Sequence, residues 1–251
     1  MIATPRVSVV LATYNAAEAL EECIHSVVQQ SHSNWELLIA DGGSTDGTVD
    51  LIKRYESHIV WWQSCRDKGI YDAWNQALLH AHGDYVCFIG ADDRLADPET
   101  LCAMADALGS KRPDVVSAKG QLIDNEDHPI LTFGEAWDYK ALRRHIRICH
   151  PGTWFKRDLF GIYGFFNLHY RIVADYEWLL RLPESTSAHF INRTIIRIGN
   201  GGVSRTQVWR RLRERREAQA NCPRIGPSLA YLYWLDKLWR WPIARFLGLQ
   251  H

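Results

Sequence analysis

Two adjacent acids, Asp92 and Asp93, follow the apolar run DYVCFIG at residues 84–90. Neighbouring carboxylates repel each other unless a cation or solvent offsets their charge, and carboxylates with phosphate oxygens are preferred ligands of Mg²⁺ and Mn²⁺. The pair therefore predicts a divalent-metal site at the end of a strand. The alternative is an exposed acidic turn in which Asp93 or Asp97 caps a helix near Pro98.

A third acid, Asp41, begins a loop of glycines and hydroxyl-bearing residues, ADGGSTDGT at residues 40–48. An acid at a strand end can accept hydrogen bonds from a ribose or a base, and glycines let a ligand approach the backbone closely. The alternative is a strand-to-helix turn whose Asp or Ser caps the helix. The loop lacks the closing glutamate of an EF-hand and the GxGxxG of a dinucleotide site.

Between these acids, the segment DKGIYDAWNQAL at residues 67–78 opens a predicted helix with Asp67, Lys68 and Gly69. A helix N-terminus beside a lysine favours anions such as phosphate. Ordinary capping of the helix is the alternative.

These polar segments belong to a regular alternation of strand and helix patterns. Strands are predicted at residues 6–13, 35–40, 58–63, 84–90, 114–123 and 188–198, and helices at 20–28, 49–55, 73–81, 98–108 and from 174. The alternation predicts an α/β fold with a mostly parallel, Rossmann-like sheet and helices on both faces, in which ligands bind beyond the carboxyl ends of the strands. That rule gathers at one edge the residues Thr13, Tyr14, Asn15, Asp41, Asp67, Asp92 and Asp93.

The bulk composition limits the classes of protein that the chain can represent. A length of 251 residues predicts one large domain, or one domain and a tail. The net formal charge is zero, so no overall field attracts nucleic acid. The six cysteines form no CxxC pair, which suits a reducing compartment. We see neither a signal-peptide pattern nor an apolar run of spanning length, and expect a cytoplasmic protein.

Four segments, VSVVLATYNA, ADGGSTDGT, DKGIYDAWN and GADD, occur in this order along the chain. Together they resemble the family 2 glycosyltransferases, which have the GT-A fold, and four motifs in order are more specific than any one. The resemblance runs from about Val7 through the GNGGVS loop at residues 199–204. Within that family, DKGIYDA-N is similar to bacterial enzymes that build surface polysaccharides from nucleotide sugars.

The resemblance implies a role for each matching position. The residues implied in binding the nucleotide-sugar donor are Thr13, Tyr14, Asn15, Asp41, Asp67, Lys68, Asp92 and His150. In the family's metal motif, often written D-x-D, the last acid binds the metal on the diphosphate, and here that acid is Asp93. The family's catalytic base matches Asp175 in VADYEWLLRL, although Ala174 stands where the family often has Glu.

The chemistry of sugar transfer agrees with these roles. Breaking the bond from an anomeric carbon to a diphosphate leaves negative charge that a divalent ion offsets. One carboxylate on the opposite face suffices to take the acceptor proton in a single displacement with inversion, whereas a retaining glycosidase uses two. Glu177 is the competing base, and the alternative for Asp175 is an N-cap of the helix that follows.

Two further segments could contribute to the site. His150, in CHPGTWFKR, could touch the diphosphate, the metal or the acceptor, or be a histidine satisfied by the backbone. The GNGGVS loop, with Arg205 beside it, could close over the diphosphate; a plain hairpin or linker is the alternative.

The character of the chain changes after Ser204. We predict a GT-A domain at residues 1–204, with a donor half to about 110 and an acceptor half from about 111, and a helical extension at 205–251. The aromatic and basic composition of the extension predicts docking on the inner face of a membrane, where a lipid-linked acceptor would lie. Packing on the catalytic domain or a homodimer contact is the alternative. The residues concerned are Arg210, Arg211, Arg213, Arg215, Arg216, Leu229, Tyr231, Leu232, Trp234, Leu235, Lys237, Leu238, Trp239, Arg240, Trp241 and Arg245.

The sequence thus predicts an inverting, Mg²⁺- or Mn²⁺-dependent transfer of a sugar from a nucleotide sugar to a glycan or lipid-linked glycan. One rival is a non-catalytic nucleotide-sugar-binding protein, which we would expect to have lost the acids. The other is a nucleotidyltransferase on a similar sheet, which normally has a glycine- and Lys/Arg-rich loop after its first strand. This chain has TYNAAEAL there.

Overall fold

The structure is a computed structural model that describes residues 4–109, 111–202 and 206–246, with side chains described as far as residue 236. The strands are β1 (Val7–Thr13), β2 (Trp35–Asp41), β3 (Ile59–Ser64), β4 (Tyr85–Gly90), β5 (Asp93–Leu95), β6 (Val115–Ile123), β7 (Pro129–Phe133), β8 (Trp154–Lys156) and β9 (Ala188–Ile198). The helices are α1 (Ala17–Val28), α2 (Thr48–Arg54), the short 3₁₀ helix η1 (Glu56–His58), α3 (Ile70–Leu78), α4 (Thr100–Leu108), α5 (Tyr139–Leu142), α6 (Asp158–Tyr163), α7 (Ala174–Arg181), α9 (Val208–Asn221) and α10 (Gly226–Phe246).

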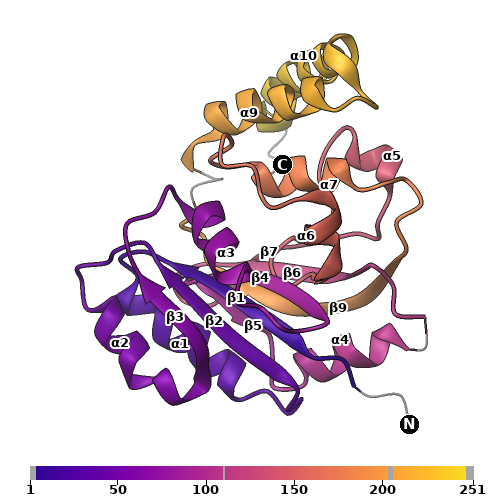
Figure 1. Ribbon diagram of the computed structural model, residues 1–251. Helices are drawn as coiled ribbons and strands as arrows, with labels where there is room; N and C mark the ends of the chain where they lie inside the picture. Colours follow the sequence, from indigo (N-terminus) through magenta and orange to yellow (C-terminus); the bar gives the residue numbers. More distant parts are fainter. Residues whose placement is uncertain (1–3, 110, 203–205, 247–251) are drawn as a thin grey trace.

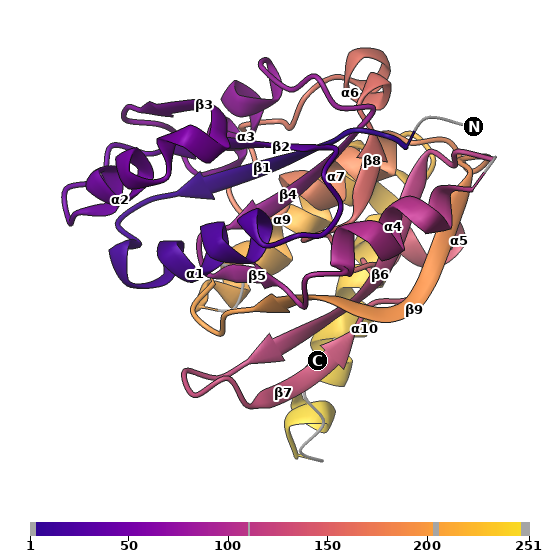
Figure 2. The ribbon, with the colours of Figure 1, turned by 90° about the horizontal axis from the view of Figure 1, so that it is seen from below.

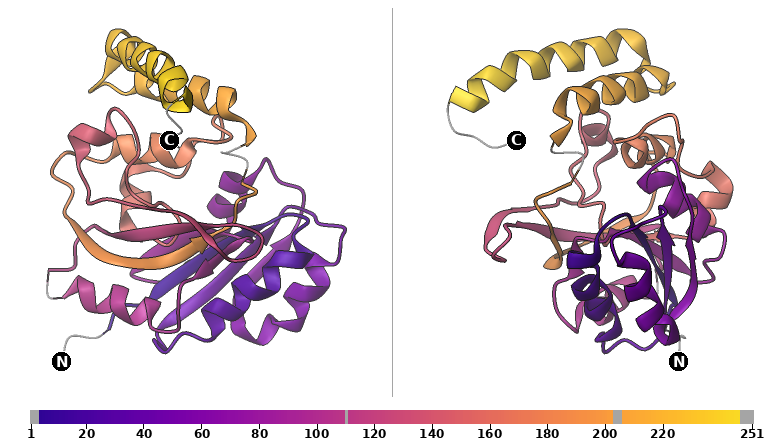
Figure 3. Two further views of the ribbon diagram at one scale, coloured as in Figure 1. Left: turned by 180° about the vertical axis from the view of Figure 1, so that it is seen from behind. Right: turned by 90° about the vertical axis from the view of Figure 1, so that its left-hand side faces the viewer.

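The strands form one curled sheet in the order β3-β2-β1-β4-β8-β6-β9-β5, with β7 paired to β6. The first four strands are parallel, as predicted. The second half is mixed, because β8 runs antiparallel to both β4 and β6, whereas β9 runs parallel to β6. The hairpin of β6 and β7 extends away from the rest of the sheet (Figures 2 and 3).

Helices cover both faces of the sheet, because the apolar side chains of each central strand alternate between two cores. In β1, Val9 and Leu11 belong to the core beneath α1, α2 and α4, whereas Val10 belongs to the core beneath α3, α6 and α7. Figure 1 shows these two groups of helices on opposite sides of the sheet. Both cores are fully buried around β1, which fixes the strand ends that carry the predicted site.

Three short strands were not predicted. Strands β5 and β8 have three residues each, too few for an alternating pattern, and they form only through pairing with distant partners. Strand β7 is exposed along its whole length, so it carries no buried face that a pattern could reveal. Asp93 therefore does not lie in a turn after the fourth strand but begins β5, opposite Ile198 of β9.

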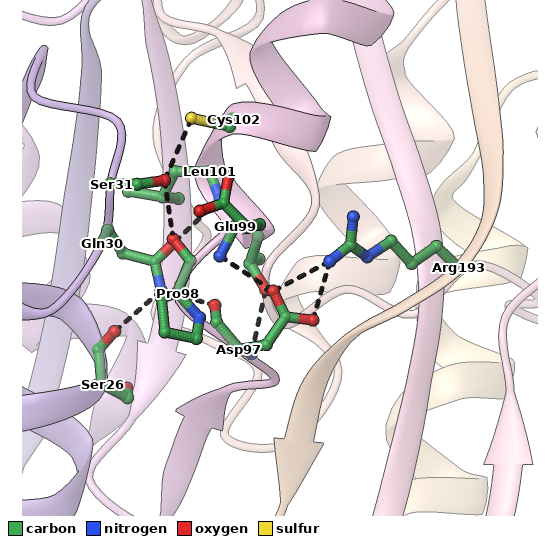
Figure 4. A network of polar contacts seen from close by, with 10 residues as sticks. Ser26, Gln30, Ser31, Asp97, Pro98, Glu99, Leu101, Cys102 and Arg193 are labelled. Carbon is green, nitrogen blue, oxygen red and sulfur yellow. Dashed lines mark hydrogen bonds and ion pairs between the residues drawn. The ribbon is translucent and has the colours of Figure 1, made fainter.

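A polar network anchors the chain beyond β5 to α1 and β9 (Figure 4). The Gln30 side-chain amide donates to the backbone carbonyls of Ser26 and Asp97 at 2.9 and 2.8 Å, and its oxygen accepts from the Leu101 amide at 2.9 Å. The Asp97 carboxylate accepts two hydrogen bonds from Arg193, at 2.8 and 2.9 Å. These contacts join the chain that follows β5 to α1 and to β9.

The two C-terminal helices pack against each other and lie over α7, on the same side of the sheet as α3 (Figures 1 and 3). The Arg224 guanidinium of their connection donates to the Tyr139 hydroxyl and the Leu182 carbonyl, both at 2.9 Å. None of the helices in the described part of the chain is long and apolar enough to cross a membrane. All six cysteines are free thiols.

Candidate active site

The loops that follow β1 and β2 are tied together by side chains of the predicted donor site. The buried Asp41 carboxylate accepts from the Gly43 and Ser44 amides at 3.1 and 2.9 Å, and from the Ser44 and Ser64 hydroxyls. The side chain of Asn15 accepts from the Thr45 amide at 3.0 Å. Asp41 does not cap α2, whose N-cap is Gly47 and has no side-chain bond. Its bonds close the turn after β2, and its contact with a nucleoside stays a prediction.

Gly42 is the point where three donor loops meet. A Cβ atom at this position would lie 3.0 Å from Oδ2 of Asp67 and 3.2 Å from the Tyr14 ring. The Tyr14 ring itself is exposed, whereas Thr13 beside it is buried and its hydroxyl has no hydrogen-bond partner among the described residues. The loops after β1, β2 and β3 thus bring the exposed Tyr14 ring and the Asp67 carboxylate together around Gly42.

The start of α3 is shaped by Asp67, as the DKG segment predicted. Oδ1 of Asp67 accepts from the Gly69 amide at 2.7 Å, and the Lys68 amide donates to Asp72 at 2.9 Å. Gly69 has a φ of 110°, which favours glycine, and a Cβ there would lie 3.7 Å from the guanidinium of Arg171. An exposed lysine and an exposed arginine therefore flank the first turn of α3.

The acid pair lies at the carboxyl end of β4, as predicted. The Gly90 amide donates to Oδ2 of Asp93 at 2.7 Å, and a Cβ at Gly90 would lie 3.1 Å from Asp92 and 3.4 Å from Asp93. Asp93 is buried and Asp92 is exposed, so burial first, and then the Asp92 charge, raise the pKa of Asp93 to about 8. The helix-capping alternative for Asp93 is wrong, because Asp93 lies in β5.

This pair fits a divalent cation that is shared with a phosphate ligand. Two carboxylates meet over a glycine, and the hydrogen bond from the Gly90 amide only partly opposes the raised pKa of Asp93. No group of three or more His, Cys, Asp or Glu side chains suited to a metal lies in the described residues. An ion here would therefore take its remaining ligands from the substrate and from water, as Mg²⁺ commonly does.

Asp175 is the second residue of α7 and is half-buried. The helix is capped at Val173 without a side-chain bond, so the N-cap alternative for Asp175 is wrong. Oδ1 of Asp175 instead accepts a hydrogen bond of 2.9 Å from the Tyr71 hydroxyl of α3. The competing acid, Glu177, is held in a two-point ion pair with Arg181, one arm of which measures 3.0 Å.

His150 lies close enough to Asp175 for that charge to act on its ring. Its ring is buried and stacks on Trp74 and Phe88, with centroids 5.7 and 5.9 Å away. Burial lowers the pKa of His150, and the charge of Asp175 partly opposes this shift. The pKa of the preceding Cys149 thiol is raised by burial and by the charge of Asp93. Nε2 of His150 has no hydrogen-bond partner in the described structure, unlike a histidine satisfied by the backbone.

Sequence reasoning missed several residues that shape the site. Tyr71 was inside a recognised motif, but its contact with Asp175 spans 104 residues. Glu214 of α9 is buried and accepts from the Arg171 and Ile172 amides at 3.0 and 2.8 Å. Gly199, the first glycine of the GNGGVS loop, packs on Asp92, while residues 203–204 of that loop and Arg205 beside it lie outside the described residues. No sequence pattern indicated the role of Glu214.

Comparison with known proteins identifies the family to which this chain belongs. The family model for glycosyl transferase family 2 matches residues 8–161. A PGL/p-HBAD biosynthesis glycosyltransferase of Mycobacterium tuberculosis is 34% identical over 184 residues, which cover 72% of this chain and 70% of the relative. A putative teichuronic acid biosynthesis glycosyltransferase of Bacillus subtilis, TuaG, is 42% identical over 95 residues, or 36% of this chain and 37% of TuaG.

Solved structures share the fold. The 1–349 fragment of S. aureus TarS in complex with UDP-GlcNAc superposes with a TM-score of 0.70 at 17% identity, covering 93% of this chain and 71% of TarS. The mannosyltransferase PcManGT from Pyrobaculum calidifontis, in complex with GDP-Man and Mn²⁺, superposes with a TM-score of 0.66 at 22% identity, covering 94% and 70%. With the family model spanning more than half of its length, this chain belongs to glycosyl transferase family 2 and is a glycosyltransferase of the GT-A fold.

Proposed function

We propose that the protein transfers a sugar from a nucleotide sugar to a hydroxyl of a glycan or lipid-linked glycan, with inversion and with Mg²⁺ or Mn²⁺. Surface-polysaccharide biosynthesis is the proposed role. The observation that carries the proposal is that two acidic centres lie near one short segment: the charge of Asp93, beside Asp92, acts on Cys149, and the charge of Asp175 acts on the neighbouring His150. A displacement needs charge neutralisation on one side of the anomeric carbon and a base on the other.

On the donor side, the loops after β1, β2 and β3 surround Gly42 with an exposed ring and an acid. Nucleotide sugars are bound by two structurally similar proteins, TarS with UDP-GlcNAc and PcManGT with GDP-Man. We therefore assign Thr13, Tyr14, Asn15, Asp41 and Asp67 to the nucleoside and Lys68 to the phosphates. His150, whose Nε2 lacks a partner in the described structure, is assigned to the donor as well.

Asp93, with Asp92 beside it, would hold the divalent ion against the diphosphate. When bound, the ion supplies positive charge that offsets the charge developing on the leaving nucleoside diphosphate. Burial and the charge of Asp92 raise the pKa of Asp93, and a bound cation would stabilise the charged form of this carboxyl. One structurally similar enzyme, PcManGT, was solved with Mn²⁺.

Asp175 would act as the general base. Its Oδ1 is occupied by Tyr71, and Oδ2 accepts no hydrogen bond from the described residues. The proton of the acceptor hydroxyl passes to this carboxylate while the hydroxyl oxygen bonds to the anomeric carbon and the carbon–diphosphate bond breaks. Glu177 is less suited to this step, because Arg181 already engages both of its oxygens.

A donor screen tests the proposal. UDP-, GDP- and dTDP-sugars are each added with Mn²⁺ or with EDTA, and the rise in Tm and the release of nucleoside diphosphate are measured. We expect one nucleotide class to raise Tm and to be turned over only with the metal, and NMR of the first product to show an inverted anomer. Full turnover in EDTA or a retained anomer would reject the mechanism. Binding without turnover would favour the non-catalytic rival, and release of pyrophosphate from a nucleoside triphosphate would favour the nucleotidyltransferase.

A further inference from the structure

The Tyr71 hydroxyl connects the donor motif to the proposed base. Tyr71 lies on α3, two residues after Gly69, and is buried with 7% of its surface exposed. Its oxygen lies 2.9 Å from Oδ1 of Asp175 and 2.8 Å from the carbonyl oxygen of Ile172. The ring is held by an edge contact with Trp74 and a tilted contact with Phe166, each with centroids 5.5 Å away. The phenol therefore cannot turn away from these two acceptors without disturbing the core.

Two acceptors compete for one hydrogen. A tyrosine hydroxyl donates one hydrogen bond, and both Oδ1 of an ionised Asp175 and the Ile172 carbonyl can only accept. Burial, and then the Asp175 charge, raise the pKa of Tyr71 well above its ordinary value, so the phenol keeps its hydrogen at neutral pH. A hydrogen bond to a carboxylate is stronger than one to a carbonyl, so the hydrogen belongs to Asp175 while that group is charged.

We propose that Tyr71 is a positioning residue for the base: its hydroxyl occupies Oδ1 of Asp175, leaves Oδ2 to the acceptor, and turns its hydrogen to the Ile172 carbonyl when the carboxyl becomes neutral. This inference rests on the proposed function of Asp175. The alternative acceptor at 2.8 Å means that the buried phenol is satisfied in both states of the carboxyl. The site thus holds the base in one geometry before and after proton transfer.

The proton balance of the step is simple. The acceptor O–H bond breaks, its oxygen bonds to the anomeric carbon, and the electron pair of the broken carbon–oxygen bond leaves with the nucleoside diphosphate. The proton arrives on Oδ2 of Asp175. Tyr71 neither gains nor loses a proton, because its hydrogen only changes acceptor from Oδ1 to the Ile172 carbonyl. Neutral Asp175 returns its proton to water after the product leaves.

In the described structure, the acids near Asp175 are engaged elsewhere, and Arg171 is the charged group that is not. On its own helix, Glu177 is paired with Arg181. From α9, Glu214 is buried, pairs with Arg210 and accepts from two backbone amides. The remaining neighbours are His150, whose pKa is lowered by burial, and Arg171, whose guanidinium lies beside Gly69 rather than in an ion pair among the described residues. Tyr71 is the group that hydrogen-bonds directly to the carboxylate of Asp175.

The test is Tyr71→Phe in the full chain, with Tyr85→Phe as the matched control. Tyr85 is also a buried tyrosine with one hydroxyl bond, of 2.8 Å to the Pro113 carbonyl, but it lies at the opposite end of β4. With the donor identified by the screen and Mn²⁺ present, kcat, both KM values and the pH profile of kcat are measured. We expect Tyr71→Phe to lower kcat about tenfold or more, the effect of losing a hydrogen bond to a charged group. Donor KM should stay within about twofold.

The pH profile separates positioning from a purely structural role. The ionised carboxylate loses its hydrogen bond in Tyr71→Phe, so the acid limb of kcat should move to higher pH. A fluorinated tyrosine at position 71 keeps the shape and donates more strongly, so the limb should move to lower pH. If the acidic limb of the pH profile of kcat moves in neither variant, the inference is wrong. If Asp175→Asn is inactive while Tyr71→Phe matches the wild type, only this inference fails; if Asp175→Asn is fully active, the proposed function fails.

Discussion

At the scale of single residues, the metal role of Asp93 has a pH signature. Its pKa is raised from 3.8 to about 8, so its contribution to stability is present at low pH and is lost as the pH rises toward about 8. A bound cation must displace the proton below that pH. We expect the rise in Tm caused by Mn²⁺ with a nucleoside diphosphate to grow from about pH 6 to about pH 8 and then level off. Asp93→Asn should abolish it; a rise that is constant over this range contradicts the assignment.

A glycine beside the acid pair gives a second residue-scale prediction. A Cβ at Gly199 would lie 2.8 Å from Oδ2 of Asp92, whereas a Cβ at Gly201, in the same loop, would meet nothing within 4 Å. Gly199→Ala should therefore displace Asp92 and raise the concentration of Mn²⁺ needed for half-maximal turnover, and Gly201→Ala should not. Equal effects of both substitutions would show that Asp92 has no bearing on metal use.

The positions that could be predicted from the sequence are those of acidic residues that follow a strand. Asp41, Asp67 and Asp93 lie where a parallel sheet puts them, because the register of β1, β2, β3 and β4 brings the strand ends level. Tyr71 and Glu214 could not be predicted, since each acts through a contact with a distant segment that leaves no local pattern.

At the scale of elements, α9 supports the segment that leads into α7. Glu214 satisfies two backbone amides just before Asp175, so Glu214→Ala would leave both without a partner at a cost of about 1–3 kcal/mol in the free energy of unfolding. We expect a lower Tm and a lower kcat with unchanged binding of the nucleoside diphosphate. The control is Glu217→Ala, which removes a surface pair with His169. A normal kcat in Glu214→Ala would show that support from α9 does not affect the reaction.

The predicted boundary after residue 204 stays a prediction. A change in composition marks that point, but contacts cross it: Gln219 donates to the Arg143 carbonyl at 2.8 Å, and Arg215 lies over the Tyr176 ring at 5.3 Å. The long strands were predictable because their buried faces repeat. The three-residue strands β5 and β8 were not, because only tertiary pairing defines them.

At the scale of the whole molecule, the helical extension keeps part of the surface expected of a membrane-docking face. Tyr231, Leu232 and Leu235 are exposed on α10 at positions that share one face of a helix. Two of the predicted arginines contact other side chains of the extension, since Arg210 pairs with Glu214 and the exposed Arg216 lies 5.1 Å above the Trp234 ring. The predicted positions from Lys237 onward have no described side chains.

We retain peripheral membrane docking through this face as a proposal. Replacing Tyr231, Leu232 and Leu235 together by Ser should reduce co-sedimentation with anionic vesicles, because apolar burial and charge attraction act together at the interface. Replacing the exposed Leu79 and Ile162 by Ser, away from the extension, is the control. Equal sedimentation of both variants would leave packing or a homodimer contact as the role of the extension.

The central claim is that Asp175 takes the acceptor proton, and one rate comparison tests it most directly. Asp175→Asn and the surface control Asp50→Asn are assayed for sugar transfer with Mn²⁺, at a donor concentration shown by Tm to saturate both. The account predicts that Asp175→Asn binds donor and metal normally but transfers about 10²-fold more slowly or worse, while Asp50→Asn transfers at the wild-type rate. Wild-type transfer by Asp175→Asn, together with loss of transfer in Glu177→Gln, would contradict it and assign the base to Glu177.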